Sequence, residues 1–228
     1  VSHHAVLSQQ KTTKCRPVCN SSLPNNKTTL NKMLAKGPSS LTNLLHVLLR
    51  FRSRPFVIIA DLAKAYNTIK TGEKEMHLRR LLWWLPGDDF QSKPRTFGYI
   101  VLAFGDTPSA CFLEYSKQEI ARYMRVNLKE ENLAHDFIAM SYVDDIAIAI
   151  NTMKEAKIYS DKLPQGLEAY GFKIKPPIKI GEDKGSVPDR PSDADTMNLF
   201  GHSYCQATDE ITLKFNVNVN VKKKVASF

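Results

Sequence analysis

The chain has 228 residues, of which 43% are hydrophobic, 9% aromatic and 24% charged. This length and composition are typical of a globular protein with its own core, and they exclude a disulfide-stapled miniprotein, a fibrous protein and a disordered one. The formal net charge of +9 favours a polyanionic partner.

The excess of basic residues lies entirely within the first sixty residues. That segment contains nine Lys and Arg residues and no Asp or Glu, so the rest of the chain carries equal numbers of basic and acidic residues. A basic block of this kind is either a solvated face or a surface that binds phosphate groups. Charge alone leaves both interpretations open.

No membrane span, zinc site or disulfide framework is predicted. The longest apolar runs, 56–60 and 146–150, are far shorter than the roughly 18 residues that cross a bilayer. Cys15 and Cys19 have no second Cys or His pair nearby, so they do not predict a zinc site. Four cysteines and the lack of a charged-then-apolar leader indicate an intracellular protein, cytoplasmic or nuclear.

The first half of the chain predicts a helix, a strand and a second helix. Leucines at helical spacing predict an amphipathic helix over 41–49 with Ser40 as its cap. The continuous apolar run 56–60 predicts a buried strand that ends at Asp61. Leucine spacing predicts a further helix over 78–85, which a Pro-Gly pair stops.

The second half predicts a hairpin among helices. The elements are a helix after the turn at 105–108, strands 137–142 and 146–150, a helix over 152–170, a loop over 181–198, and short strands 199–204 and 211–215. This order lacks the regular βαβ alternation of a doubly wound sheet. The predicted fold class is therefore α+β, with a mainly antiparallel sheet backed by helices.

Three acidic residues stand at the ends of apolar strands. Asp61 follows a buried run, and Asp144 and Asp145 lie at the turn of the predicted hairpin, where carboxylates need solvent, hydrogen bonds or a cation. The pair Asp88 and Asp89, in a polar connection, is explained by turn preference alone. If the strand that ends at Asp61 lies beside the hairpin, the three acids form a site for two Mg²⁺ ions about 3.5–4 Å apart, which suits phosphoryl transfer.

Three segments that contain these acids resemble one family of proteins. Tyr142-Val143-Asp144-Asp145 resembles the catalytic box of retroviral-type reverse transcriptases, 56–66 resembles their first catalytic motif, and 104–109 resembles the motif between them. The greatest similarity is to the BEL/Pao group of LTR retrotransposons. The residues that carry it are Ser2-His3-His4 with Val6, Lys14-Cys15-Arg16-Pro17-Val18, Leu30-Asn31 with Leu34, Gly37-Pro38, and Leu48-Leu49-Arg50-Phe51-Arg52.

The resemblance implies a right-hand polymerase palm with a fingers subdomain and without a thumb. The palm of this family is a ferredoxin/RRM-like antiparallel sheet backed by helices. Transferred to this chain, the divisions are fingers at 1–38 and 69–104, palm at 39–68 and 105–215, and a basic C-terminal tail at 216–228.

The resemblance also implies roles for individual residues. Asp61, Asp144 and Asp145 would bind the two Mg²⁺ ions, or Mn²⁺ in their place, and would be the catalytic residues. The incoming deoxynucleotide would contact Arg16, Leu62, Tyr66, Phe104, Gly105 and Lys175, with Arg16 on the triphosphate and Tyr66 as the steric gate against a ribose 2′-hydroxyl. Nucleic acid would contact Tyr142, Leu199, Phe200 and Gly201, the last three as the start of the primer grip.

One segment departs from the family pattern. Where the family usually continues into a Lys-Trp pair, Gly171-Phe172-Lys173-Ile174-Lys175 runs into Pro176-Pro177. The identity of the proton-donating lysine therefore stays open, with Lys175 as the first candidate and Lys173 as the second.

The function that the resemblance implies is RNA-directed DNA polymerase. The partners would be an RNA template, a DNA primer and deoxynucleotides, and the thumb, ribonuclease H and integrase domains of a polyprotein would be missing. The location would be a cytoplasmic retroelement particle or the nucleus. Two alternatives stay open: an inactive nucleic-acid-binding remnant, and an RNA-templated RNA polymerase or other two-metal transferase, against which the aromatic at Tyr66 argues. The oligomeric state stays open as well.

Overall fold

The computed structural model describes residues 2–7, 15–25, 27–85, 87–174, 178–180, 196–205, 208 and 210–212. The chain divides into two compact units, Val1–Gly181 and Glu182–Phe228, and each is described by itself. No helix among the described residues is long and apolar enough to cross a bilayer.

The first unit is built around an antiparallel sheet. Its strands are β3 (Phe56–Ala63), β6 (Ser141–Tyr142), β7 (Asp145–Ile150), β8 (Lys173–Ile174) and β9 (Ile178–Ile180). The order is β6-β7-β3-β8, and β9 also pairs with β3. Every strand pair in the described part of the chain is antiparallel, which confirms the predicted α+β class.

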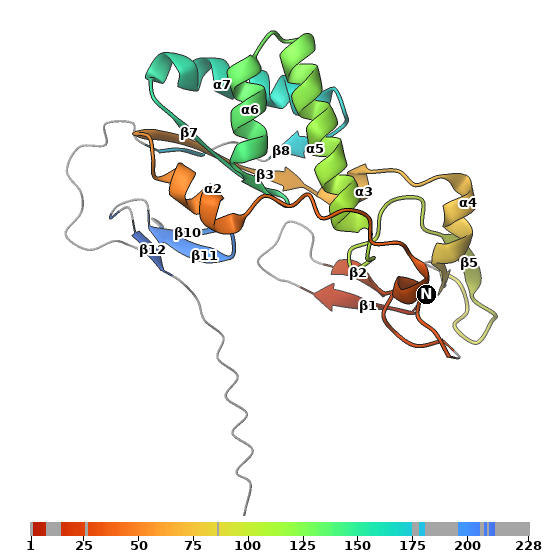
Figure 1. The fold of residues 1–228 in the computed structure, drawn as a ribbon. Coiled ribbons are helices and arrows are strands. Elements are labelled where there is room, and N and C mark those ends of the chain that lie inside the picture. The colour runs from red at the N-terminus through yellow and green to blue at the C-terminus, as the bar shows by residue number, and fades with distance from the viewer. Residues whose placement is uncertain are drawn as a thin grey trace, which may run out of the picture. The chain divides into compact units, whose positions relative to one another are not determined.

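Helices cover this sheet in a layer. The three long helices are α5 (Ser109–Val126), α6 (Glu131–Ala139) and α7 (Met153–Glu168), and Figure 1 shows them together on one side of β3 and β7. Helix α2 (Leu44–Phe51) contacts β6 and β7. In chain order β3, α5, β6, β7, α7 and β8 form a split β-α-β-β-α-β arrangement.

The core lies between the sheet and the three long helices. Alternate residues of β3 and β7 contribute to it, and the helices add leucine and aromatic side chains; fully buried members are Ile58, Ile146, Ile148, Leu113, Ile120, Phe137 and Leu163. Each such side chain stabilises the fold by about 1.5–3 kcal/mol relative to exposure. At one edge, Arg54 forms an ion pair of 2.8 Å with the buried carboxylate of Asp136.

The remaining elements of the first unit are short. Strands β1 (Ser2–Leu7) and β2 (Cys15–Asn20) form one antiparallel pair, and β4 (Arg80–Trp83) and β5 (Arg95–Gly98) form another. The rings of His3 and Trp83 lie 5.4 Å apart and join the two pairs. The short helices are α1 (Leu30–Met33), α3 (Ala65–Thr68), α4 (Glu73–Met76) and the 3₁₀ turn η1 (His77–Arg79).

The described part of the second unit is a three-stranded antiparallel sheet. Its strands are β10 (Thr196–Leu199), β11 (His202–Cys205) and β12 (Glu210–Thr212). Phe200 and Gly201 connect β10 to β11 with φ of 52° and 80°. Positive φ at both central residues is typical of a type I′ hairpin turn.

Two of the predicted helices differ in the structure. The helix predicted over 78–85 is wrong, because Leu81 and Leu82 lie in β4 and pair with β5. Leu78 and Leu82 are 46% and 54% exposed, so their spacing does not mark a buried helical face. The first helix begins after Asn43 rather than Ser40, since the Asn43 side chain accepts from the amides of the first turn.

Two of the predicted strands also differ. The strand over 137–142 is wrong for most of its length, because α6 continues to Ala139 and only the last two residues pair with β7. An apolar run this short fits a buried helix as well as a strand. The strand over 199–204 is a hairpin instead, because the Phe200-Gly201 turn divides it. Residues 181–195 of the predicted loop and 213–215 of the predicted last strand lie outside the described residues. The last three residues of the predicted loop, 196–198, lie in β10 instead.

Candidate functional site

The sheet register places two of the predicted acids opposite each other. Val57 to Ala60 in β3 pair with Ile146 to Ala149 in β7, and the next pair along is Asp61 with Asp145. The apolar residues of both strands are buried, so burial fixes this register. The acids therefore face each other because the apolar runs beside them match.

The third acid lies in the turn between β6 and β7. Tyr142 pairs with Asp145, which leaves Val143 and Asp144 as the two central residues. Val143 has a φ of 52°, although the first central position of such turns favours glycine. This conformation costs a β-branched residue about 1–3 kcal/mol, so other contacts must hold it. One of them is the hydrogen bond of 2.9 Å from the Leu62 amide to the Asp144 carbonyl.

The chemistry of these acids fits a hard divalent cation. Asp144 is exposed, while Asp61 and Asp145 are half-buried, and carboxylate oxygens are the ligands that Mg²⁺ prefers. Among the described residues, no three His, Cys, Asp or Glu side chains are gathered closely enough to hold a metal ion. The backbone therefore brings the three acids together without arranging their carboxylates around one point.

A charged pair that the sequence analysis missed lies beneath the turn. Glu114 and Lys117 of α5 are 3% and 1% exposed, and Lys117 Nζ lies 2.6 Å from Glu114 Oε1. Burial raises the pKa of Glu114 and lowers the pKa of Lys117, and their mutual attraction opposes both shifts. A signal existed, because Lys117 is four residues after Leu113 and three before Ile120, on the apolar face of the helix.

Tyr66 and Phe104 form an aromatic pair near the acids. Their ring centroids lie 5.8 Å apart in an edge-on arrangement. Burial, followed by the charges of Asp144 and Glu114, raises the pKa of Tyr66. Phe104 is 66% exposed and Tyr66 is half-buried, so the pair presents an apolar surface near the acids.

Gly105 lies in a loop that α1 holds in place. Its φ of 99° is a conformation that favours glycine. The Asn31 side chain donates to the Gly105 carbonyl and accepts from the Thr107 amide, each at 2.9 Å. One amide side chain thus fixes the backbone on both sides of Asp106.

The adjacent Asp106 joins segments that are distant in the sequence. It is buried, accepts from the hydroxyl of Ser21, and forms an ion pair of 2.5 Å with Arg79. The side chains of Arg79 and Asp106 are 5% and 0% exposed. The motif at 104–109 is therefore anchored to the turn after β2 and to η1 through a buried charge, a role that the sequence did not indicate.

Other predicted site residues contribute less or lie elsewhere. Leu62 is 2% exposed and packs into the core, so only its backbone reaches the turn. Tyr142 is half-buried at the end of β6. The backbone of Arg16 lies in β2 opposite Val6, but its side chain lies outside the described residues, as does all of Lys175.

The predicted primer-grip residues belong to the second unit. Leu199 ends β10, and Phe200 and Gly201 form the turn to β11. Leu199 and Phe200 are 2% and 5% exposed, whereas Gly201 is exposed. Within that unit the three residues mark the tip of a hairpin.

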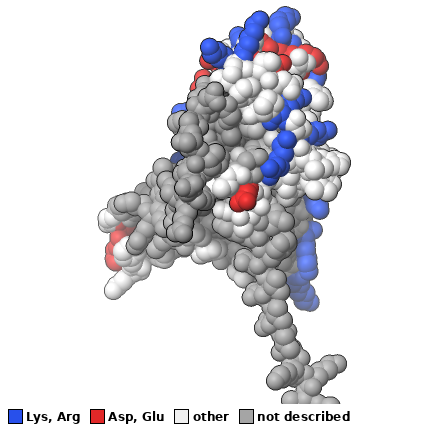
Figure 2. Space-filling view, turned by 90° about the vertical axis from the view of Figure 1, so that its left-hand side faces the viewer, with Lys and Arg blue, Asp and Glu red and all other residues white. Residues whose placement is uncertain are grey.

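The basic first quarter of the chain is only partly available to a ligand. Lys27, Lys32 and Lys36 are exposed, but Arg54 pairs with Asp136 and Arg50 donates to the Ala139 carbonyl. Figure 2 shows one face of the molecule, on which Lys and Arg side chains run down the right-hand side. The exposed lysines favour binding of a polyanion, while the two arginines stabilise the fold.

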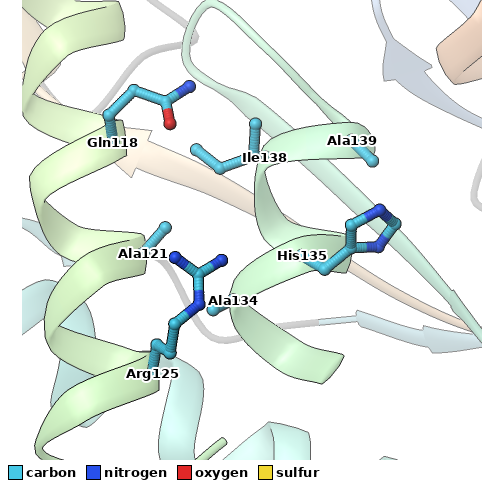
Figure 3. A pocket seen from close by; sticks show the side chains of 7 residues that line it. All are labelled: Gln118, Ala121, Arg125, Ala134, His135, Ile138 and Ala139. Carbon is cyan, nitrogen blue, oxygen red and sulfur yellow. The ribbon is translucent and has the colours of Figure 1, made fainter. Parts of the chain in front are cut away.

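A hollow between α5 and α6 lies apart from these residues. It has a volume of about 180 Å³ and is lined by Gln118, Ala121, Arg125, Ala134, His135, Ile138 and Ala139 (Figure 3). None of the predicted site residues lines it. The candidate site is therefore the surface around the β6–β7 turn rather than this hollow.

Comparison with known proteins finds a similar fold in a solved structure. No family model and no curated protein matches the sequence. A solved structure titled as a foamy viral protease-reverse transcriptase in complex with double-stranded DNA is similar, with a TM-score of 0.62 and 14% sequence identity. The similarity covers 91% of this chain and 30% of that one. The fold of this chain is thus similar to part of a retroviral reverse transcriptase.

Proposed function

We propose that the chain is the fingers and palm portion of an RNA-directed DNA polymerase of the BEL/Pao type. The observation that carries the proposal is the pairing of Asp61 with Asp145 beside the turn that holds Asp144. Support comes from the fold, which is similar to part of a reverse transcriptase. The substrates would be deoxynucleotides and a primer on an RNA or DNA template.

In this proposal Asp61, Asp144 and Asp145 hold two Mg²⁺ ions, or Mn²⁺. When bound, the metals activate the primer 3′-hydroxyl and stabilise the charge of the leaving group. The paired strands β3 and β7 hold Asp61 and Asp145, and the β6–β7 turn presents Asp144. Tyr66 and Phe104 offer an apolar surface for the sugar and base, and Gly105 allows a close backbone approach.

The division of the chain into subdomains belongs to the same proposal. The strand pairs β1–β2 and β4–β5 would form the fingers and the central sheet the palm. Arg16 and the exposed lysines of the first quarter would contact phosphates, and the β10–β11 hairpin would contact the primer. The protein would act in a cytoplasmic retroelement particle or in the nucleus.

Primer extension tests the proposed function directly. The protein, alone or joined to a thumb, is expected to extend an oligo-dT primer on a poly-A template when Mg²⁺ and dTTP are supplied. The measurement is the length of labelled primer on a denaturing gel, with a reaction containing EDTA as the control. If both forms of the protein bind primer–template tightly without extending the primer, the proposed polymerase activity is wrong. The chain would then be a nucleic-acid-binding remnant.

Replacement of Tyr66 tests the choice of sugar. Tyr66→Ala is expected to raise the ratio of ribonucleotide to deoxynucleotide incorporation by about tenfold or more, because the ring would no longer fill the space beside the sugar. Tyr66→Phe keeps the ring and is the matched control, with an unchanged ratio expected. The ratio is measured by single-nucleotide extension with rNTP and dNTP in parallel. If the ratio of ribonucleotide to deoxynucleotide incorporation is the same in the wild type and in Tyr66→Ala, Tyr66 is not the steric gate.

A further inference from the structure

A buried lysine lies beneath the turn that presents the acids. Lys117 is 1% exposed, and its Nζ lies 2.6 Å from the carboxylate of Glu114, one helical turn earlier on α5. A buried ammonium group needs acceptors for its three N–H donors. Glu114 supplies the opposite charge from the same helix, as an ion pair.

Two hydrogen-bond acceptors for the ammonium group lie in the β6–β7 turn and in β6. Lys117 Nζ donates to the Val143 carbonyl and to the Ser141 hydroxyl, both at 3.3 Å. Ser141 is fully buried at the start of β6. The ammonium group thus connects α5 to the residues on both sides of Tyr142.

The turn needs such support because of its backbone conformation. Val143 adopts a positive φ that its branched side chain disfavours. Two hydrogen bonds from other elements hold the turn: one from Lys117 to the Val143 carbonyl, and one from the Leu62 amide to the Asp144 carbonyl. Together these two hydrogen bonds fix the backbone conformation of the turn, and with it the positions from which the side chains of Asp144 and Asp145 project.

We propose that the Glu114–Lys117 pair is a positioning device for Asp144 and Asp145. The inference rests on the proposed function, since it assigns the purpose of the pair to the metal-binding acids. A lysine alone at this place would repel a cation, whereas the pair is neutral. Lys117 supplies the hydrogen bonds that hold the turn, and Glu114 cancels its charge.

The test removes both members of the pair at once. Glu114→Leu with Lys117→Leu leaves no unpaired buried charge, so its melting temperature is expected to equal or exceed that of the wild type. Without the hydrogen bond from Lys117, amide hydrogen exchange in 141–146 is expected to be about tenfold faster, measured by mass spectrometry without metal. Peptides from α7 serve as an internal reference and should be unchanged.

A second measurement connects the turn to metal binding. The affinity for Mn²⁺, measured by electron paramagnetic resonance of the free ion, is expected to fall about tenfold in the double variant. The matched control is Glu119→Gln with Arg122→Gln, which removes an exposed ion pair of the same spacing from the same helix. Glu114→Gln with Lys117→Met is closer in volume and repeats the test if the leucine variant does not fold.

The outcomes separate this inference from the proposed function. If a stable double variant shows wild-type exchange in 141–146, the pair does not position the turn and the inference is overturned. Faster amide exchange in the double variant together with an unchanged Mn²⁺ affinity also overturns the inference, because the acids would then bind metal equally well without the Glu114–Lys117 pair. If the wild type binds no Mn²⁺, the metal role in the proposed function fails, while the exchange measurement still decides whether Lys117 holds the turn.

Discussion

Asp144→Asn is expected to reduce primer extension by more than about a hundredfold. Replacing even the second-shell partners of metal ligands costs about 10–100-fold, and Asp144 would be a ligand itself. Asparagine keeps the size of the side chain and leaves the hydrogen bond from the Leu62 amide to the Asp144 carbonyl intact. Binding of primer–template is therefore expected to stay within twofold or so of the wild type, since it depends mainly on phosphate contacts.

The chain provides a matched control for this variant. Asp89 belongs to the other Asp-Asp pair and is exposed, and its side chain accepts from the Gln91 amide at 2.9 Å. Asp89→Asn can keep that hydrogen bond and is expected to extend primers at the wild-type rate. The rates are compared in single-turnover primer extension at saturating Mg²⁺. Equal rates for Asp144→Asn and wild type would show that Asp144 is not a metal ligand.

Asp106→Ala is expected to lower the free energy of unfolding by about 3–5 kcal/mol. The change leaves the Arg79 guanidinium buried without its carboxylate partner and removes the acceptor of the Ser21 hydroxyl. One guanidinium nitrogen of Arg79 already finds no hydrogen-bond partner among the described residues. The buried positive charge of Arg79 therefore depends on the Asp106 carboxylate for its stabilisation. Urea unfolding monitored by tryptophan fluorescence measures the difference.

Two comparison variants make this result specific. Arg95→Ala breaks the exposed pair with Asp88, in which Arg95 is 58% exposed, and is expected to cost less than about 1 kcal/mol. Asp106→Leu combined with Arg79→Leu removes both buried charges and is expected to recover part of the loss. A midpoint for Asp106→Ala no lower than that of Arg95→Ala would mean that the buried pair does not anchor the loop.

The central sheet and the neighbourhood of Asp61 and Asp145 could be predicted from the sequence. Asp61 follows one apolar run and Asp145 precedes another, and continuous apolar runs are typical of strands that are buried on both faces of a sheet. The pattern at 137–142 did not predict the helix, because a mostly apolar run of six residues does not distinguish a buried helix from a strand. The turn of α6 into β6 depends on the α5 packing, which is a tertiary effect.

The buried polar contacts that hold the site in place could not be predicted from the sequence. Lys117 on an apolar helical face is a visible signal, but its partners Ser141 and Val143 are known only once the hairpin is placed over α5. The same holds for Asp106 and Arg79, which are 27 residues apart and meet through loop geometry. Polar contacts between distant segments follow from the fold, and local patterns carry little information about them.

The register between β3 and β7 also limits how the chain can change. Because side chains alternate between the two faces of a sheet, a deletion of one residue within Ile146–Ile150 would turn every following side chain to the opposite face. Either the isoleucines after the deletion would leave the core, or they would keep their places and Asp145 would no longer stand opposite Asp61. An insertion or deletion within these strands would therefore separate the paired acids, whereas a change of length in the segments between the strands would leave the pair in place.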